Sequence, residues 1–369
     1  MKAILILVWA CWSLQGLAAD ANSNSGHPHY RFETVVEDIG VPWGMVWLDN
    51  GDMLVSSRNG KMHRIDSEGK KTLIKGVPKV HVNGQGGLLD LERHPQYDLN
   101  GWLYLSYSSR DGEGKGSHTA IMRARLDGDR LTDQQVIYKA GPNTTSGRHY
   151  GSRIEFDREG YLYFSIGDRG DRDNLPQDLS RDGGKIYRLT DLGRVPSDNP
   201  FVGQDGANPA IYSLGHRNPQ GMAMHPLSGD IWIHEHGPRG GDEVNLIKAG
   251  ANYGWPILSY GINYSGSEFA EAETREGYES PVHYWDPSIA PSGMTFVTSP
   301  RYPEWRGDLL VGSLKFRYLV FCEVAGDSIM STRIMFEDIG RVRTLREGPD
   351  GYLYVATEDN GIIRIVPKD

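Results

Sequence analysis

One pattern recurs six times along this chain of 369 residues: an apolar alternating run, a tight turn rich in Asp, Asn and Gly, and a second run that ends in small or polar residues. The copies are WGMVWLDNGDMLVSS from Trp43, GLLDLERHPQYDLNGWLYLSY from Gly87, SRIEFDREGYLYFSIGD from Ser152, GMAMHPLSGDIWIHEHG from Gly221, GMTFVTSPRYPEWRGDLLVGSL from Gly293 and VRTLREGPDGYLYVATED from Val342. Alternation with a period of two around NG, EG, SG and DG turns is typical of antiparallel hairpins. The pattern therefore predicts six sheets.

Equivalent points of the six copies are 44 to 72 residues apart, which is enough for a four-stranded sheet and one functional loop. Radial repetition protects sheet edges and gathers loops around a central channel. We therefore predict an all-β, six-bladed β-propeller with four-stranded antiparallel blades, in preference to a β-sandwich or a two-domain β protein. A ring must join its ends, so the early YRFETVVEDI is expected to complete the last blade beside GIIRIVP.

The first 19 residues are typical of a cleavable secretory signal, because one lysine precedes an apolar run and small residues surround Ala18 and Ala19. We expect a signal peptide at 1–19, a flexible segment at 20–30 and a propeller catalytic domain at 31–369, in a periplasmic or secreted protein. The apolar run is shorter than the roughly 20 residues of a membrane span. A lipidated Cys11 is the alternative. Signal removal leaves Cys322 as the one cysteine, which excludes an internal disulfide.

The charge pattern argues against a nucleic-acid partner. The formal net charge is −9 and the chain has no basic run that would neutralise phosphates. The acidic stretch SGSEFAEAETREGYES, residues 265–280, is expected to be a short helix or a solvated surface excursion without chemistry.

The segment HEHGPRGGDEVNL, residues 234–246, concentrates polar groups that a packed core does not accept cheaply. His234 and His236 share one face of a strand, but a third zinc ligand at the spacing of known motifs is missing. The glycines allow backbone carbonyls to turn inward, while Asp242 and Glu243 supply carboxylate oxygen, a mixture that suits calcium. A solvated polar loop is the alternative.

Several cations are expected near one mouth of the channel. Arg217 and Asn218 precede Pro219, which favours an extended or turn segment at the end of a blade. Arg341 and Arg343 lie two apart, on one face of a predicted strand, so they require open solvent or an anion between them. Lys315 occupies the equivalent region of the preceding blade. Together they suit a small polyanion, although surface salt bridges are the alternative.

His149 lies in a glycine-flanked turn before one strand, and Asp168 follows the strand predicted to pair with it. A lone histidine is more often structural, but a neutral imidazole that a carboxylate orients is a competent general base. The chain lacks the G-x-S-x-G elbow, the P-loop and a G-x-G-x-x-G that opens a helix, which disfavours serine hydrolases, NTPases and Rossmann dehydrogenases.

The blocks NGQGGLLDLERHP, SLGHRNPQGMAMHP, EHGPRGGDEVNLIKAGANYGWP and GPDGYLYV resemble the signature of the glucose/sorbosone dehydrogenase family, in particular its soluble aldose sugar dehydrogenases that use pyrroloquinoline quinone (PQQ). The resemblance runs from about Arg31 to Pro367. It implies a propeller with the quinone and Ca²⁺ in the channel mouth. The positions that match cofactor contacts are Gln85, Arg217, Asn218, Lys315, Arg341 and Arg343.

The resemblance also assigns metal and catalytic positions. Gly237 and Pro238 match backbone ligands of the calcium that touches the quinone, and Glu243 and Tyr253 match a further calcium site through the carboxylate and the carbonyl. His149 matches the base that takes the proton of the anomeric hydroxyl, and Asp168 matches the carboxylate that steadies it.

The implied reaction is oxidation of an aldose to its lactone, with hydride transfer to the calcium-activated quinone and an electron acceptor that stays unknown. Arg148 replaces an acid of the classical glucose enzyme, so the sugar preference is open, and the oligomeric state is open as well. A calcium-dependent lactonase and a non-enzymatic secreted propeller that binds glycan or protein are the alternatives.

Overall fold

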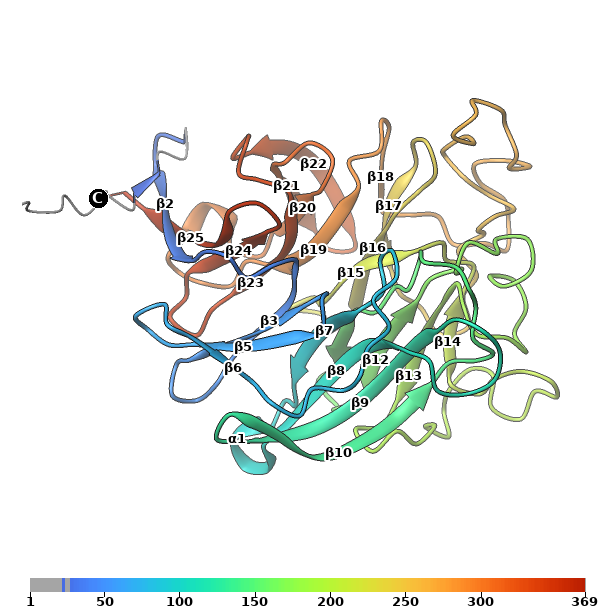
Figure 1. Ribbon diagram of the computed structural model, residues 1–369. Coiled ribbons are helices and arrows are strands. Elements are labelled where there is room, and N and C mark those ends of the chain that lie inside the picture. The colour runs from blue at the N-terminus through green and yellow to red at the C-terminus, as the bar shows by residue number, and fades with distance from the viewer. Residues whose placement is uncertain (1–21, 24–26, 369) are drawn as a thin grey trace, which may run out of the picture.

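The structure is a computed structural model that describes residues 22–23 and 27–368. These residues form six antiparallel sheets and two short helical turns, α1 (Tyr97–Asn100) and η1 (Pro303–Trp305). Five sheets have four strands and the sixth has five (Figure 1). The predicted all-β propeller of six four-stranded blades is confirmed, with one additional two-residue strand.

Consecutive segments form the first five blades, and the strands of each blade pair in chain order. Blade 1 contains β3 (Pro42–Trp47), β4 (Met53–Ser57), β5 (Lys61–Ile65) and β6 (Lys71–Leu73), and blade 2 contains β7 (Leu88–Arg93), β8 (Trp102–Ser109), β9 (His118–Asp127) and β10 (Arg130–Lys139). Blade 3 contains β11 (Ile154–Phe156), β12 (Leu162–Ile166), β13 (Lys185–Leu189) and β14 (Ile211–Leu214). Blade 4 contains β15 (Pro219–Met224), β16 (Ile231–Glu235), β17 (Asp242–Leu246) and β18 (His283–Trp285), and blade 5 contains β19 (Pro291–Phe296), β20 (Leu309–Ser313), β21 (Leu319–Ala325) and β22 (Ser328–Met335).

Both ends of the chain build blade 6. Its strands are β23 (Val342–Glu347), β24 (Leu353–Thr357), β25 (Gly361–Pro367), β2 (Tyr30–Val36) and the short β1 (Asn22–Ser23). β25 pairs with β2 in antiparallel register, so the predicted completion of the last blade by the N-terminal strand is confirmed. The first strands of neighbouring blades contact one another around a closed circuit from β3 through β7, β11, β15, β19 and β23 back to β3. Such a circuit defines a ring of sheets.

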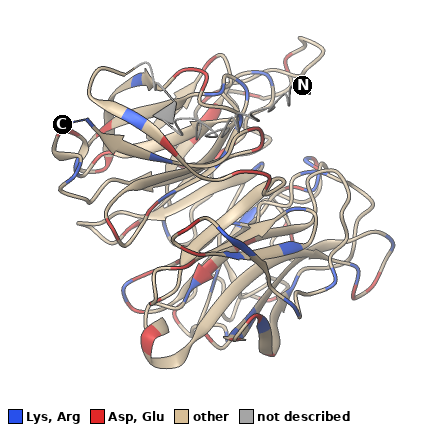
Figure 2. Ribbon diagram, turned by 60° about the vertical axis from the view of Figure 1, so that its left-hand side comes forward, with Lys and Arg blue, Asp and Glu red and all other residues tan. Residues whose placement is uncertain are grey.

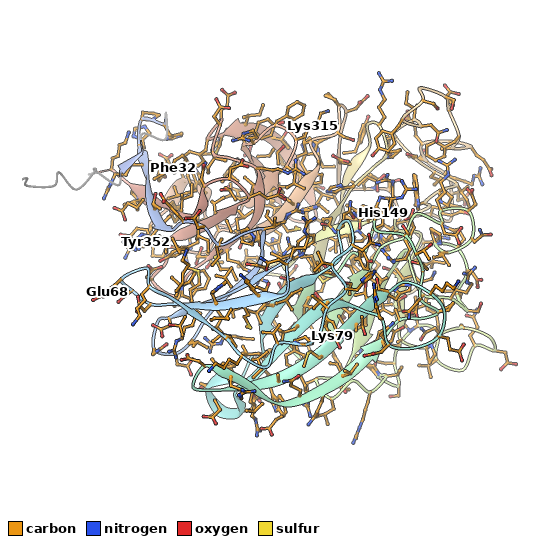
Figure 3. The ribbon with its side chains drawn as sticks, viewed as in Figure 1. Phe32, Glu68, Lys79, His149, Lys315 and Tyr352 are labelled. Atoms are coloured by element: carbon orange, nitrogen blue, oxygen red, sulfur yellow. The ribbon has the colours of Figure 1, made fainter. Side chains whose placement is uncertain are left out.

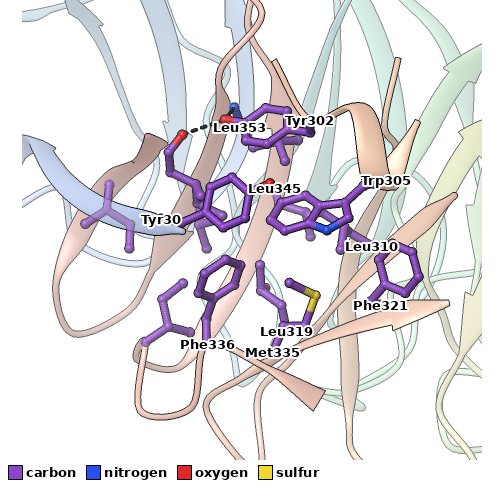
Figure 4. Packing of buried hydrophobic residues seen from close by; sticks show 14 of the residues in the cluster. Tyr30, Tyr302, Trp305, Leu310, Leu319, Phe321, Met335, Phe336, Leu345 and Leu353 are labelled. Carbon is purple, nitrogen blue, oxygen red and sulfur yellow. Dashed lines mark hydrogen bonds between the residues drawn. The ribbon is translucent and has the colours of Figure 1, made fainter. Parts of the chain in front are cut away.

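Aromatic residues fill the space between blades 5 and 6 (Figure 4). The rings of Tyr302 and Trp305 stack with centroids 5.2 Å apart, and Tyr30 from β2 packs 4.4 Å from Trp305. The Tyr302 hydroxyl donates to Ile365 O and accepts from Leu353 N–H, so this buried tyrosine joins the two blades with its polar end satisfied. Burial of these aromatic side chains between blades 5 and 6 stabilises the closure of the propeller.

A buried arginine holds the centre of the ring together. Arg153, which directly precedes β11, donates to the carbonyl oxygens of Trp43, Gln220 and Arg343, which belong to blades 1, 4 and 6. Its guanidinium also lies 3.2 Å from the Asp90 carboxylate of blade 2. One side chain therefore links five blades at the axis.

Strand direction places two kinds of connection at one end of the ring. Because neighbouring strands are antiparallel, the segments that join successive blades lie at the same end as those that join the second and third strands of each blade. We call this the interblade end. His149 and Lys315 lie in such connections, whereas Glu68 and Tyr352 lie in turns of the opposite end. Figure 3 shows Glu68 and Tyr352 at the left, His149 at the right and Lys315 at the top.

The surface carries both signs of charge. Acidic and basic residues are both distributed over the strands and loops of the described chain (Figure 2). Residues 265–280 are an excursion outside any helix or strand. Cys322 is buried and unpaired. Among the described residues, no helix has the length and apolar character needed to cross a membrane. The predicted signal peptide at 1–19 lies outside the described residues.

Candidate active site

The predicted site residues gather at the interblade end. They lie in the β6–β7 (Gln85), β10–β11 (His149), β12–β13 (Asp168), β14–β15 (Arg217, Asn218), β16–β17 (Gly237, Pro238), β20–β21 (Lys315) and β22–β23 (Arg341) connections, and Glu243 and Arg343 are the second residues of β17 and β23. Tyr253 belongs to the long β17–β18 connection, which leaves from the other end. That connection returns to the interblade end, where Tyr253 N–H donates to Leu214 O and Trp255 N–H donates to Gly215 O.

His149 and Asp168 form a buried pair, as predicted from the hairpin. The Nδ1 of His149 lies 2.6 Å from Asp168 Oδ1. The same carboxylate accepts a second bond from Gly170 N–H, and its Oδ2 accepts from the indole Nε1–H of Trp255 at 2.9 Å. Asp168 is thus fixed on three sides. With a proton on Nδ1, the imidazole of His149 presents Nε2 as an acceptor.

The electrostatics of this pair suit a base. Burial lowers the pKa of His149, Asp168 opposes that shift, and Arg217 and Arg148 add to it. Burial alone would raise the pKa of Asp168, but the hydrogen bond and charge of His149, together with Arg217, hold it below its ordinary value. The carboxylate stays ionised and the imidazole stays neutral near neutral pH.

A pocket of about 260 Å³ opens beside the pair. Its lining comes from five connections, β10–β11, β12–β13, β14–β15, β16–β17 and β17–β18: Arg148, His149, Asp168, Gly170, Asp171, Arg172, Asp173, Arg217, Pro238, Trp255, Asn263 and Tyr264. Arg217 is 7% exposed, donates to His236 O and lies 5.3 Å from the Trp255 ring centroid. In the described part of the chain, its guanidinium has no carboxylate within 4.0 Å. A buried cation without an anionic partner fits an anionic ligand.

A second, smaller cavity of about 10 Å³ adjoins Arg217, Gly237, Glu243 and Tyr253. Two carboxylates line it, because the buried Glu235 faces it as well as the partly buried Glu243. Burial raises the pKa of Glu243, and the neighbouring Glu235 and Asp242 add to the shift. The room suffices for one small species, and in the described residues neither carboxylate has a Lys or Arg side-chain nitrogen within 4.0 Å, so the pair fits a metal ion. The described residues contain no cluster of three or more His, Cys, Asp or Glu side chains that could hold a metal by themselves.

The remaining predicted cations, Lys315, Arg341 and Arg343, are not part of the walls of these two cavities. Arg341 and Arg343 both bind the carboxylate of Glu358, which supplies the anion that their spacing required. Lys315 is linked to them through its neighbour, because Arg341 donates to Leu314 O at 2.9 Å. Burial lowers the pKa of His236 to about 3, and Arg217, His149 and Arg343 act in the same direction, which places these groups within electrostatic reach of one another.

Several side chains hold the loops of the site in place through hydrogen bonds. Gln85 Oε1 accepts from His149 N–H at 2.7 Å, and Asn218 Oδ1 accepts from Gly151 N–H at 3.2 Å. Asp242 accepts from Gly237 N–H and Ala290 N–H, which folds the glycine-rich loop back on itself. The rings of His234 and His236 face carbonyl oxygens of blade 5, those of Gly293 and Pro291.

Sequence reasoning did not single out three residues that complete the site. Trp255 binds Asp168, Glu235 binds His216 and the backbone of Arg217, and Glu358 joins the two arginines. Trp255 lies in the block that ends in GWP, so the family resemblance was a signal for it. Glu235 and Glu358 stand at the ends of predicted strands. The sequence around such a position does not show whether its carboxylate has a buried partner or faces solvent.

With this geometry established, comparison with known proteins defines the class: the chain belongs to the glucose/sorbosone dehydrogenase family, whose model matches residues 39–365. It is 41% identical over 346 residues to aldose sugar dehydrogenase YliI of Escherichia coli, covering 91% of this chain and 93% of that protein. The apo crystal structure of the soluble aldose sugar dehydrogenase of E. coli superposes with a TM-score of 0.88 at 38% identity, over 92% of this chain and 100% of that one. The PQQ-bound aldose sugar dehydrogenase of Streptomyces coelicolor gives 0.75 at 29% identity, over 91% and 97%. These relatives support an oxidoreductase.

Proposed function

We propose that this protein oxidises the anomeric hydroxyl of aldose sugars to aldonolactones, with PQQ and Ca²⁺ as its cofactors. The observation that carries the proposal is the His149–Asp168 pair, 2.6 Å apart, in the wall of a pocket that also contains the buried cation Arg217. A purely structural histidine has no need of an open pocket beside it. The names of the E. coli and S. coelicolor relatives support the substrate class and the quinone.

The chain's own residues supply the proton chemistry. Asp168 holds Nδ1–H of His149, so Nε2 accepts the proton of the anomeric hydroxyl as that oxygen becomes a carbonyl oxygen. The imidazolium that forms gains the Asp168 charge as its partner, and Trp255 keeps the carboxylate in place. The bound quinone and its calcium supply the acceptor for the hydride that leaves the anomeric carbon.

The residues present fit the quinone, a planar tricarboxylate. Among the described residues Arg217 has no carboxylate within 4.0 Å of its guanidinium, and Trp255 lies against it as a flat apolar wall. We assign the remaining contacts to Gln85, Asn218, Lys315, Arg341 and Arg343. Glu358 offsets part of the charge of the two arginines, so the pocket tolerates them before a ligand arrives.

Calcium ligands come from the glycine-rich loop and its surroundings. Gly237 and Pro238 offer backbone carbonyls next to the pocket, and we assign to them the calcium that contacts the quinone. Glu243 and the Tyr253 carbonyl would hold the further ion at the small cavity, where Glu235 adds negative charge.

Reconstitution tests the proposal directly. Purified protein is incubated with PQQ and Ca²⁺, and reduction of a dye is followed with a panel of aldoses. Turnover that requires both cofactors is expected. His149→Ala should lower turnover about 100-fold or more while quinone titration stays unchanged, and Arg343→Ala should weaken quinone affinity. Hydrolysis of aldonolactones with calcium alone would favour a lactonase instead, and no turnover of either kind would favour a binding propeller.

Export is part of the proposal. We infer that residues 1–19 are removed and that the mature protein works in the periplasm or outside the cell, where a further acceptor takes the electrons. The mass of the mature chain from intact cells tests this, since cleavage after Ala19 leaves Asp20 as its first residue.

A further inference from the structure

Arg169 is a buried cation that neither the pocket nor the proposed cofactor contacts require. It directly follows Asp168 and is 1% exposed. The described residues place no carboxylate within 4.0 Å of its guanidinium. Its Nη1 donates to Arg148 O, its Nη2 donates to Ser146 O at 2.6 Å, and its guanidinium carbon lies 3.5 Å from the centroid of the Tyr150 ring. Among the described residues, the groups in contact with this guanidinium are carbonyls and a ring, and Asp168 acts on it from a longer distance. Such a buried charge is costly to keep, which points to a role for the contacts it makes.

All of these contacts fall on one turn, residues 146–150, which carries His149. That turn is conformationally unfavourable, because His149 has a φ of 57°, in the left-handed region that a non-glycine residue adopts rarely. Gln85 holds one side of the turn, since its N–H donates to Gly147 O and its Oε1 accepts from His149 N–H. Arg169 holds the other side through the carbonyls on either side of Gly147.

Two separate links therefore connect His149 and Asp168. The first link is direct, from His149 Nδ1 to Asp168 Oδ1. The second runs through the backbone, from Asp168 to the adjacent Arg169 and from its guanidinium to Arg148 O, the carbonyl just before His149. Asp168 itself is fixed by Trp255 and Gly170 N–H. Only the histidine side of the pair depends on the second link.

We propose that Arg169 is a positioning residue that holds the 146–150 turn in its unfavourable conformation and so keeps the His149 ring on Asp168. The planar guanidinium suits this task because two of its nitrogens reach two carbonyls while its face covers Tyr150. Lysine would keep the charge but has no fork with which to bridge both carbonyls. Without the two hydrogen bonds from Arg169, the 146–150 turn relaxes and the His149 ring moves away from the Asp168 carboxylate.

The first test needs no turnover and so is independent of the proposed function. In the NMR spectrum of the apoprotein, the hydrogen-bonded Nδ1 proton of His149 gives a downfield resonance, assigned by its loss in His149→Ala. We expect this resonance to vanish or broaden in Arg169→Met and to return in part in Arg169→Lys. The matched control is Arg158→Met, because Arg158 also donates to two carbonyls, those of Pro226 and Leu227, at the opposite end of the ring. An unchanged resonance in folded Arg169→Met overturns the proposal.

The second test rests on the proposed function and measures turnover of the reconstituted enzyme. Displacement of a catalytic group by about 1 Å costs roughly 100-fold, so Arg169→Met should lower kcat by about that factor, with the KM for aldose and the quinone titration within about threefold of wild type. In a His149→Ala background the same substitution should have almost no further effect, because the two residues act as one unit. A loss that adds fully to that of His149→Ala, or that only follows the folded fraction, overturns the positioning role. If the wild type oxidises no aldose, the proposed function fails while the NMR result still decides the role of Arg169.

Discussion

Trp255 Nε1–H donates to Asp168 Oδ2 at 2.9 Å, and this bond joins two segments that are 87 residues apart in the chain. The indole also faces Arg217 and meets Phe269 edge to face, so one side chain connects the carboxylate, the cation of the pocket and the surface excursion. The long β17–β18 connection is thereby part of the site and not only its neighbour.

Trp255→Phe should separate the hydrogen bond from the packing. Phenylalanine keeps an apolar ring against Arg217 and Phe269 but leaves one Asp168 oxygen without its donor. Because a hydrogen bond to a charged group contributes about 1.5–3 kcal/mol, kcat should fall by about 10-fold or more, with quinone affinity nearly unchanged. Steady-state kinetics and a quinone titration check this. A variant with wild-type kcat would show that Gly170 N–H and His149 suffice to hold Asp168.

The pH dependence follows from the partners of His149. Burial lowers its pKa below the ordinary 6.5, and Asp168 is the group that opposes this shift. The base is neutral above that pKa, so kcat/KM should be level at neutral pH and decline as the pH falls through the lowered value. Asp168→Asn removes the opposing charge, so the acid limb should move to lower pH.

The same variant should lose rate at every pH. Both oxygens of Asp168 accept hydrogen bonds. The NH2 of asparagine therefore meets either His149 and Gly170 N–H or the Trp255 indole N–H as donor against donor. The neutral amide also stabilises the imidazolium poorly, so the plateau should drop about 100- to 10,000-fold. Profiles of kcat/KM for wild type and Asp168→Asn, measured with one aldose, test both statements. An acid limb that moves to higher pH in the variant would contradict the role assigned to Asp168.

The blades were predictable because their pattern is local. In the copy that begins at Ser152, alternation and an EG turn alone predict the hairpin of β11 and β12, and Ile154↔Phe164 pairing follows from that turn. The completion of blade 6 was predictable for another reason, namely that a ring must close. His149 and Asp168 were predictable as a pair because His149 precedes β11 and Asp168 follows β12, which places both at the open end of one hairpin.

Contacts that depend on the return of distant loops were not predictable in this way. Nothing near Arg153 indicates that its side chain reaches the carbonyls of Trp43 and Arg343, since those contacts exist only once the ring has closed. Glu358 directly follows β24 and meets Arg341 and Arg343 at the start of the paired strand β23, a contact that requires the register of these two strands. The sequence predicted an anion site at the two arginines because nothing next to them in the chain shows that Glu358 is their partner.

Substitution of Arg153 and Asp90 tests how much their contacts at the centre of the ring contribute to the stability of the fold. Arg153→Met leaves the Asp90 carboxylate, which is buried and also accepts from Ile154 N–H, without its cation. Loss of one partner of a buried pair costs about 3–5 kcal/mol, so the free energy of unfolding in urea should fall by about that amount. Adding Asp90→Asn removes the orphaned charge and should recover part of the loss.

An exposed arginine serves as the matched control for that measurement. Arg275 pairs with Glu271 four residues earlier on the surface excursion, where ion pairs contribute little. Arg275→Met should therefore change the free energy of unfolding by less than about 0.5 kcal/mol. Equal losses for the Arg153 and Arg275 variants would contradict a special role of the axis.

Calcium at the small cavity should stabilise the fold through Glu243. An ion that binds only the native state at about 100 times its Kd adds roughly 2.7 kcal/mol to the free energy of unfolding, so chelation should lower the Tm of the quinone-free protein. In Glu243→Gln the carboxylate that faces the cavity is neutral, and the difference in Tm between calcium and chelator should shrink strongly. Glu279→Gln is the control on the same connection, because Glu279 pairs with Lys248 at the surface and faces neither cavity, so its response to calcium should equal that of the wild type. A Glu243→Gln protein that gains as much from calcium as the wild type would remove this carboxylate from the metal site and leave the raised pKa of Glu243 as a consequence of burial, Glu235 and Asp242.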